Sequence, residues 1–281
     1  MTIISCSLFL FLVLFSVIYS KEKAVLISFV PVLCLSTFFA HITDIYGIIA
    51  IFAFTIVAFV HFYKDFRNKI SYYSSSLIFI TMIYYFIMHK MPGFCNPIVV
   101  DHVRVSQMSS PFSMNINFDK VICALLIFLT NNCIKLSPLI PSSKLKYTIK
   151  ISLACILLML TPAVCSGFVK FDPKIPDITA IWIINNFFFV CFSEEIIFRG
   201  YIQDRIFHIT KNPNFAILAV SLIFGLYHIN HGIILAVFSA ICGLFYGYAF
   251  YKTNNVLSSM LVHFSLNFCH FILFTYPHFM R

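Results

Sequence analysis

Residues 185–201 read NNFFFVCFSEEIIFRGY, an apolar run that ends in two acids and an arginine. Apolar runs of similar character recur from one end of the 281-residue chain to the other. Hydrophobic residues make up 60% of the chain and charged residues 10%, and the mean hydropathy is +0.94, values far outside those of soluble domains. We therefore predict an integral membrane protein without a sizeable soluble domain.

Ten apolar segments approach the length of about 20 residues that a helix needs to cross a bilayer. They are residues 3–20, 24–40, 45–63, 72–89, 119–134, 149–169, 178–198, 213–229, 232–251 and 255–275. The runs are continuously apolar instead of alternating, which disfavours a β-barrel, and backbone groups in lipid then require helices. The prediction is an all-α, polytopic transmembrane helical bundle of about 8–10 spans, the lower number if shorter segments are re-entrant or interfacial. The first run resembles a signal peptide but has no basic n-region and no clear cleavage site, so we expect a retained span.

The formal charge of +9 does not indicate a nucleic-acid partner, because the basic residues are scattered through short connections instead of forming a stripe. Under the ten-span prediction, 13 of the 19 Lys and Arg residues fall on one side and 6 on the other, which favours both termini outside. The ten cysteines include no C-x-x-C and mostly fall inside apolar runs. They indicate neither a disulfide framework nor a thiolate metal site.

Residues 90–118 form the longest polar connection and contain three prolines, so we predict a surface loop there. This connection divides the chain into an N-terminal transmembrane region of unknown role, residues 1–118, and a C-terminal helical bundle, residues 119–281. Acids and histidines inside apolar helices concentrate in the last hundred residues. A charge at membrane depth costs at least a few kcal/mol, so these residues locate the function.

Glu195 and Arg199 are four positions apart, so on a helix they share one face and can form an ion pair. Adjacent helical residues diverge by about 100°, so Glu194 serves a different purpose and can act as a base or a metal ligand. Its apolar surroundings are expected to favour proton transfer. The alternative is that the three residues are an interfacial cluster where a helix leaves the bilayer.

In the next apolar segment, Phe224 and His228 share a face, and Gly225 is small enough to let a neighbouring helix approach. A lone histidine near a helix end is most often interfacial or satisfied within the fold, which is the alternative for His228. His231 is a weaker candidate because it lies beyond the expected helix end.

The last apolar segment places His263 and Asn267 one turn apart on the same face, deep within a helix. Two polar side chains on one stripe predict a shared polar partner. The alternative is that they only bond one helix to another. His270 is off this stripe and nearer the helix end, so it is left out of the site.

Together, the three predicted helices carry one carboxylate outside the predicted ion pair, two histidines and one carboxamide, a set of side chains that suits water-mediated hydrolysis. We expect Glu194, helped by His228, to deprotonate a water molecule, while His263 and Asn267 donate hydrogen bonds to the oxyanion on a scissile carbonyl. No cofactor is favoured, but Glu194, His228 and His263 could instead hold a catalytic zinc ion. No H-E-x-x-H motif is present, although ligands can come from separate helices.

At these residues the chain resembles the CPBP family of membrane proteases, named for CAAX prenyl proteases and bacteriocin-processing proteins and also called the Abi family. That family is recognised by E-E-x-x-x-R, F-x-x-x-H and H-x-x-x-[NDB]-type motifs on successive core helices. This sequence has EEIIFR at 194–199, FGLYH at 224–228 and HFSLN at 263–267, in that order. The resemblance covers roughly residues 148–275, and the earlier part of the chain matches no family by its motifs.

The resemblance implies an intramembrane endopeptidase in which Glu194 is the catalytic carboxylate, with Glu195, Arg199 and Phe224 in support. The family is described both as metalloproteases and as glutamate-type proteases, and a carboxamide beside the second histidine favours the metal-independent mechanism. The implied partners are the lipid bilayer and a membrane-associated or lipidated peptide that enters laterally, in the plasma membrane of the cell. The rival interpretations are a proton-coupled transporter, for which the expected inverted repeats are not seen, and a catalytically inert immunity or scaffold protein.

Overall fold

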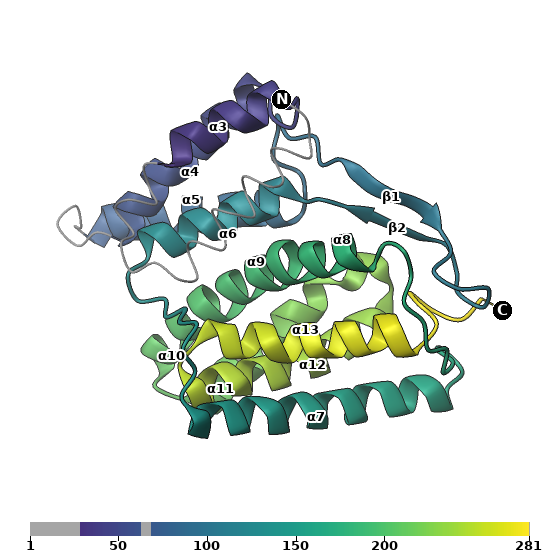
Figure 1. Cartoon of the computed structure of the whole chain (residues 1–281). Coiled ribbons are helices and arrows are strands. Elements are labelled where there is room, and N and C mark those ends of the chain that lie inside the picture. The colour runs from purple at the N-terminus through teal and green to yellow at the C-terminus, as the bar shows by residue number, and fades with distance from the viewer. Residues whose placement is uncertain (1–28, 63–68, 281) are drawn as a thin grey trace. The chain divides into compact units, whose positions relative to one another are not determined.

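The computed structural model of the protein describes residues 29–62 and 69–280 (Figure 1). The predicted span 3–20 and the start of the segment 24–40 lie outside the described residues. Five described helices are long and apolar enough to cross a membrane: Ile45–Phe62, Ser142–Cys165, Thr179–Thr210, Ile233–Thr253 and Val256–Leu273. The prediction of an all-α, polytopic membrane bundle is confirmed.

The chain forms two compact units that differ from the expected division after residue 118. Of the described residues, 29–62, 69–98 and 115–133 belong to the N-terminal unit, and 99–114 and 134–280 belong to the C-terminal unit. The difference arises because the connection at 90–118 is not one continuous loop. Its middle part packs with the C-terminal unit, and the helix that follows it packs with the N-terminal unit.

The N-terminal unit contains the helices α3 (Phe29–Phe39), α4 (Ile45–Phe62), α5 (Lys69–Ile87) and α6 (Phe118–Thr130). All 13 residues of α6 are buried, and α6 contacts both α4 and α5. The expected span at 119–134 is therefore a core helix of this unit, shorter than the roughly 20 residues that a crossing needs. An ion pair of 3.0 Å between His89 Nδ1 and the buried Asp119 carboxylate ties the end of α5 to the start of α6.

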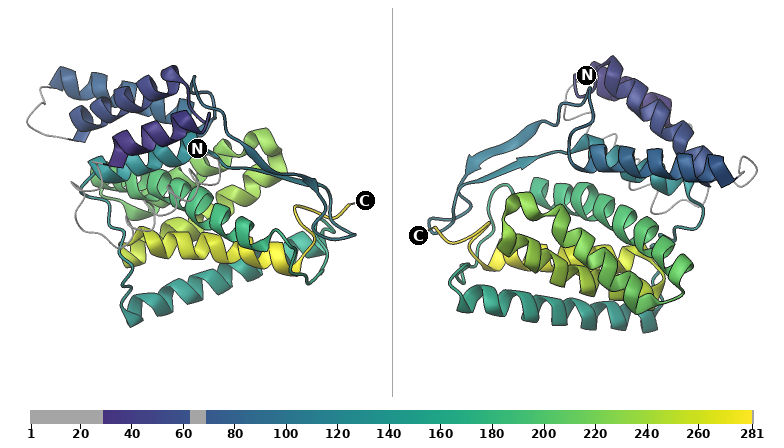
Figure 2. Two further views of the ribbon diagram at one scale, coloured as in Figure 1. Left: turned by 45° about the horizontal axis from the view of Figure 1, so that its top comes forward. Right: turned by 180° about the vertical axis from the view of Figure 1, so that it is seen from behind.

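The C-terminal unit is a helical bundle. Its helices are α7 (Ser142–Cys165), a continuous helix from Thr179 to Thr210, α11 (Pro213–Tyr227), α12 (Ile233–Thr253) and α13 (Val256–Leu273). Helices α7, α12 and α13 all contact one another, and α11 packs along α12 (Figures 1 and 2). The continuous helix is made of α8 (Thr179–Ile184), a π segment (Asn185–Cys191), α9 (Phe192–Glu195), a second π segment (Ile196–Gln203) and α10 (Asp204–Thr210). Both predicted acids thus lie in a four-residue α segment between two π segments, a kind of distortion that is frequent at functional sites.

The apolar segments predicted at 178–198 and 213–229 leave a connection at 199–212, but the helix continues through most of it, to Thr210. No Gly or Pro interrupts residues 201–210, and the chain turns only at Lys211, which has a positive φ of 54°, before Asn212 caps α11. Glu194 precedes Thr210 by 16 positions, and His228 follows Pro213 by 15. At about 1.5 Å per residue, these two residues lie at nearly the same depth on neighbouring antiparallel helices.

Helices α11 and α12 approach closely at Gly225. A Cβ atom at this position would lie 2.7 Å from both the Ala236 carbonyl oxygen and the Ala240 Cβ. The predicted role of Gly225 in the approach of a neighbouring helix is confirmed. Close packing of small residues is a common way to hold membrane helices together.

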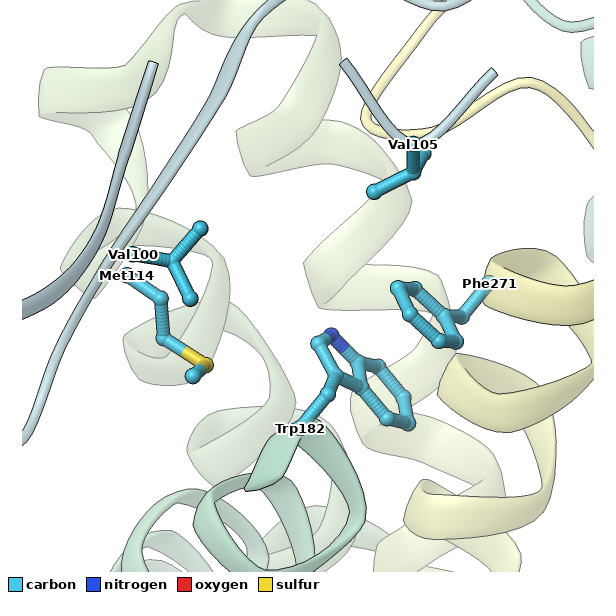
Figure 3. Packing of buried hydrophobic residues seen from close by; sticks show 5 residues of the cluster. All are labelled: Val100, Val105, Met114, Trp182 and Phe271. Atoms are coloured by element: carbon cyan, nitrogen blue, oxygen red, sulfur yellow. The ribbon is translucent and has the colours of Figure 1, made fainter. Parts of the chain in front are cut away.

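The connection at 90–118, which was predicted as a surface loop, contains a β-hairpin. Strand β1 (Ile98–Val103) is rich in β-branched residues, which favour extended backbone, and pairs with β2 (Phe112–Asn115). Three hairpin residues pack against Trp182 of α8 and Phe271 of α13 (Figure 3): Val100, Val105 and Met114. The rings of Trp182 and Phe271 stack with centroids 4.2 Å apart.

The residues that follow α13 bind the hairpin and the 168–174 connection through backbone hydrogen bonds. Met280 N donates to the Met108 carbonyl, and Thr275 N donates to the Lys170 carbonyl. Lys174 Nζ lies 3.3 Å from the Asp172 carboxylate, and burial lowers the pKa of Lys174 although Asp172 acts in the opposite direction. These contacts build an ordered layer at the end of the bundle where α13 finishes.

We expect Val100→Asp to destabilise the protein by about 2–4 kcal/mol, because it removes buried apolar contacts and places a carboxylate beside the Trp182 indole. Trp182 is the only tryptophan in the chain, so its emission reports on this cluster directly. Thermal unfolding in detergent, followed by this emission, measures the effect. Val103→Asp is the matched control, because Val103 is on the same strand but 39% exposed, and it should leave both the midpoint and the emission unchanged.

Candidate active site

The side chain of Glu195 lies at the centre of a buried polar cluster between helices. Arg199 Nη1 donates to Glu195 Oε1 at 3.2 Å, and neither side chain is exposed. The predicted ion pair is confirmed. Arg199 Nη2 also donates to the Gly243 carbonyl of α12, and the guanidinium carbon lies 4.5 Å from the Phe224 ring centre. The arginine therefore joins the continuous helix to both α11 and α12.

His263 of α13 reaches the same carboxylate. Its Nδ1 lies 2.9 Å from Glu195 Oε1, and the Tyr246 ring stacks on the imidazole with centroids 4.4 Å apart. Ser259, one turn earlier on α13, donates to Glu195 Oε2. An ionised carboxylate can only accept hydrogen bonds, so the proton of this contact is on Nδ1 and the imidazole presents Nε2 away from Glu195.

Asn267 contacts the continuous helix at a different place. Its Nδ2 donates to Asn186 Oδ1 at 3.2 Å, and the Cys191 thiol lies 3.5 Å from the same oxygen. Within the described residues, His263 and Asn267 therefore bind different protein partners, Glu195 and Asn186, and not the same one as predicted. They are one turn apart on α13, and each meets a different turn of the antiparallel helix that carries Glu195 and Asn186.

His228 caps the C-terminus of α11. Its Nδ1 lies 2.8 Å from the Phe224 carbonyl oxygen, so Nδ1 is the donor and Nε2 can accept a proton. The Phe224 ring contacts the rings of both His228 and His263, with centroids 4.7 and 6.1 Å away. Phe224 thus connects the two predicted histidines, and His231 lies outside the helix in the short turn Ile229–His231.

Glu194 is 4% exposed and lies on α9 directly before Glu195. All the predicted residues therefore fall within one bundle of three adjoining helical segments. The described contacts place Glu195, Arg199, His263 and Phe224 in one cluster. Asn267 lies one turn away from it, and Glu194 and His228 share its depth.

Residues 176–269 match the model of the Rce1-like family, described as type II CAAX prenyl endopeptidase Rce1-like. The matched segment contains all three motifs and confirms the resemblance to the CPBP family. It indicates a CAAX-type intramembrane protease. No curated protein and no solved structure matches the chain.

The predicted zinc ligands do not form a metal site in this structure. Within residues 29–62 and 69–280, no three His, Cys, Asp or Glu side chains are grouped so that they could hold a metal ion. Glu194, His228 and His263 are therefore not arranged as a ligand set in this structure. His263 directs its Nδ1 to Glu195, which leaves Nε2 as the one nitrogen open to other partners.

Three residues of the Rce1-like segment in contact with the predicted site were missed from the sequence: Asn186, Tyr246 and Ser259. Ser259 could have been found, because 259, 263 and 267 follow one stripe of α13 at intervals of four. Asn186 and Tyr246 lie on other helices. Their contacts depend on how the helices pack, and no local pattern indicates them.

Proposed function

We propose that this protein is an intramembrane endopeptidase that hydrolyses a peptide bond in a membrane-associated or lipidated protein. The observation that supports it best is the cluster in which Arg199, Ser259 and His263 converge on Glu195, within the segment that matches the Rce1-like family. A buried charged cluster inside apolar helices is costly unless it serves a purpose. In the hydrolytic mechanism proposed here, His263 stabilises the oxyanion and Glu195 holds His263 in place.

In the proposed mechanism Glu194 removes a proton from a water molecule, and His228 Nε2 assists by holding that water. The hydroxide attacks the scissile carbonyl, the carbonyl π electrons move to oxygen, and a tetrahedral oxyanion forms. His263 Nε2 and the second N–H of Asn267 donate to this oxyanion. Glu194 then passes its proton to the leaving amine as the C–N bond breaks.

The described contacts support the role of His263. For Nε2 to donate while Nδ1 also donates to Glu195, the ring must be an imidazolium. The Tyr246 ring stacks on the imidazole, which fixes the plane of the His263 ring. Asn267 keeps its second N–H for the substrate because Asn186 accepts only one. In this mechanism, Glu194 activates the water, and His263 and Asn267 stabilise the oxyanion, so neither step requires a metal ion.

The substrate is proposed to enter laterally from the bilayer as a hydrophobic or lipidated peptide, in the plasma membrane of the cell. Exposed apolar side chains line much of the outer surface of α7 and α11, for example Leu157, Leu158 and Leu226. Such surfaces suit contact with lipid. A proton-coupled transporter and an inert scaffold remain the competing hypotheses, and each predicts no cleavage.

The test is cleavage of a panel of prenylated, acylated and transmembrane-tailed peptides by the detergent-purified protein, with and without a strong zinc chelator. We expect cleavage of at least one lipidated peptide at a single internal bond, with a rate that the chelator does not change. Cleavage that the chelator stops would replace the glutamate-type mechanism with a metalloprotease. If no peptide is cleaved while the protein moves protons across proteoliposomes, the transporter hypothesis is correct instead.

A further inference from the structure

Ser259 makes a hydrogen bond that is unusual for a helical serine. Ser265 on the same helix donates back to the carbonyl of Leu261, four residues earlier, which is the ordinary arrangement. Ser259 instead directs its hydroxyl between helices, where it donates to Glu195 Oε2 and lies 2.9 Å from the Tyr246 carbonyl oxygen of α12. The residue is completely buried.

This contact completes the coordination of the Glu195 carboxylate. Arg199 and His263 both bond to Oε1, while Ser259 bonds to Oε2. The terminal torsion of a glutamate is soft and roughly two-fold, so bonds to one oxygen alone leave the carboxylate plane poorly fixed. A donor on the second oxygen holds that plane, and it also stabilises the ionised form.

The orientation of the carboxylate decides the orientation of His263. Because Nδ1 donates to Glu195, any rotation of the carboxylate moves the imidazole and the direction of its Nε2. A displacement of about 1 Å in a catalytic group costs on the order of a hundredfold in rate. The Ser259 hydroxyl therefore acts on the chemistry through two intervening side chains.

We propose that Ser259 is a positioning residue of this active site, which fixes the Glu195 carboxylate so that His263 Nε2 faces the reacting carbonyl. The inference rests on the proposed function and adds to it a residue outside the three motifs. Ser259 does not touch the substrate. Its loss should lower kcat and leave KM nearly unchanged, because the interaction that it preserves is made in the transition state.

The neighbouring residue supplies a matched control. Ser258 is also completely buried, on the same helix, but its hydroxyl has no hydrogen-bond partner in the described part of the chain. Removing that hydroxyl should leave stability and catalysis unchanged or slightly improved. A comparison of the two alanine variants separates the hydrogen bond from the general effect of a smaller buried side chain.

The experiment measures kcat and KM for the wild type, Ser259→Ala, Ser259→Thr and Ser258→Ala on the peptide that the wild type cleaves best. Ser259→Ala should lose about tenfold to a hundredfold in kcat, the effect of one hydrogen bond to a charged group, and Ser259→Thr should recover most of it. Ser258→Ala should match the wild type. A normal kcat in Ser259→Ala, or an equal loss in both alanine variants, overturns the positioning role alone.

A second measurement does not depend on cleavage. The thermal unfolding midpoints of Ser259→Ala, Glu195→Gln and the double variant form a cycle, and the proposal predicts a double-variant loss clearly smaller than the sum of the two single losses. Additive losses contradict the contact even if the enzyme is active. Absence of cleavage by the wild type overturns the proposed function and the positioning role with it, whatever the cycle shows.

Discussion

Glu194→Gln is expected to reduce peptide cleavage by roughly a hundredfold to ten-thousandfold, the contribution of general acid–base catalysis, while the protein remains folded and inserted. Glutamine has nearly the same size and hydrogen-bonding reach as glutamate but cannot take a proton from water. Because Glu194 is buried within the helix that carries the motif, this replacement preserves packing. Initial cleavage rates at equal concentrations of monodisperse protein measure the effect.

Asp204→Asn is the control for this prediction. Asp204 is an acid of the same continuous helix, but it lies beyond the motif and pairs with the half-exposed His208. Its amide variant should cleave at the wild-type rate. If Glu194→Gln cleaves as fast as Asp204→Asn does, then Glu194 is not the base and the proposed mechanism fails.

Arg199→Ala is expected to cost about 3–5 kcal/mol of stability, because it leaves the Glu195 carboxylate buried without its cation. The replacement also removes the hydrogen bond to the Gly243 carbonyl and the contact with Phe224. The continuous helix, α11 and α12 therefore lose the side chain that joins them. The predicted result is a large fall in the amount of folded protein. Fluorescence-detected size exclusion of the solubilised protein measures this fall directly.

The double variant Arg199→Met with Glu195→Leu should restore much of the folded protein without restoring cleavage, because it removes the Glu195–Arg199 ion pair as a whole and fills similar volume. Arg205→Ala serves as the control, since Arg205 is on the same helix but only half-buried, and it should fold normally. An equal loss of folded protein in Arg199→Ala and Arg205→Ala would mean that the Glu195–Arg199 ion pair does not stabilise the fold more than an ordinary half-buried arginine does.

The local features of this site could be predicted from the sequence. The pair of Glu195 with Arg199 and the shared face of Phe224 and His228 follow from helical periodicity, which operates within one turn. The tight approach at Gly225 follows from the absence of a side chain there. Apolar composition likewise sufficed for the membrane class and the all-α fold.

The contacts between helices could not be predicted in the same way. The meeting of Ser259 and His263 with Glu195 depends on the register of α13 against the continuous helix, which the packing of the whole bundle sets. The extent of that helix was also misjudged. The apolar segment was predicted to end at residue 198, yet nothing between Arg199 and Thr210 breaks a helix, and the extra turns bring Glu194 to the depth of His228.

The continuous helix Thr179–Thr210 both packs against α13 and orients side chains of the proposed active site. Three successive contacts join it to α13: Trp182 with Phe271, Asn186 with Asn267, and Glu195 with His263. The first of these holds the β-hairpin, the second fixes the carboxamide, and the third fixes the imidazole. His263 and Asn267 of α13 are thus both oriented by partners on the helix that carries Glu194, the proposed catalytic carboxylate.

The most direct test of the central claim is mass analysis of the products when the purified protein meets a lipidated peptide in water enriched in ¹⁸O. A peptidase with the proposed mechanism gives two fragments whose masses sum to the substrate plus one water, with one ¹⁸O atom in the new carboxyl group, and the Glu194→Gln variant gives no such fragments. Intact peptide after incubation with the wild-type protein, across lipidated and transmembrane-tailed substrates, would contradict the claim that this membrane protein is a peptidase.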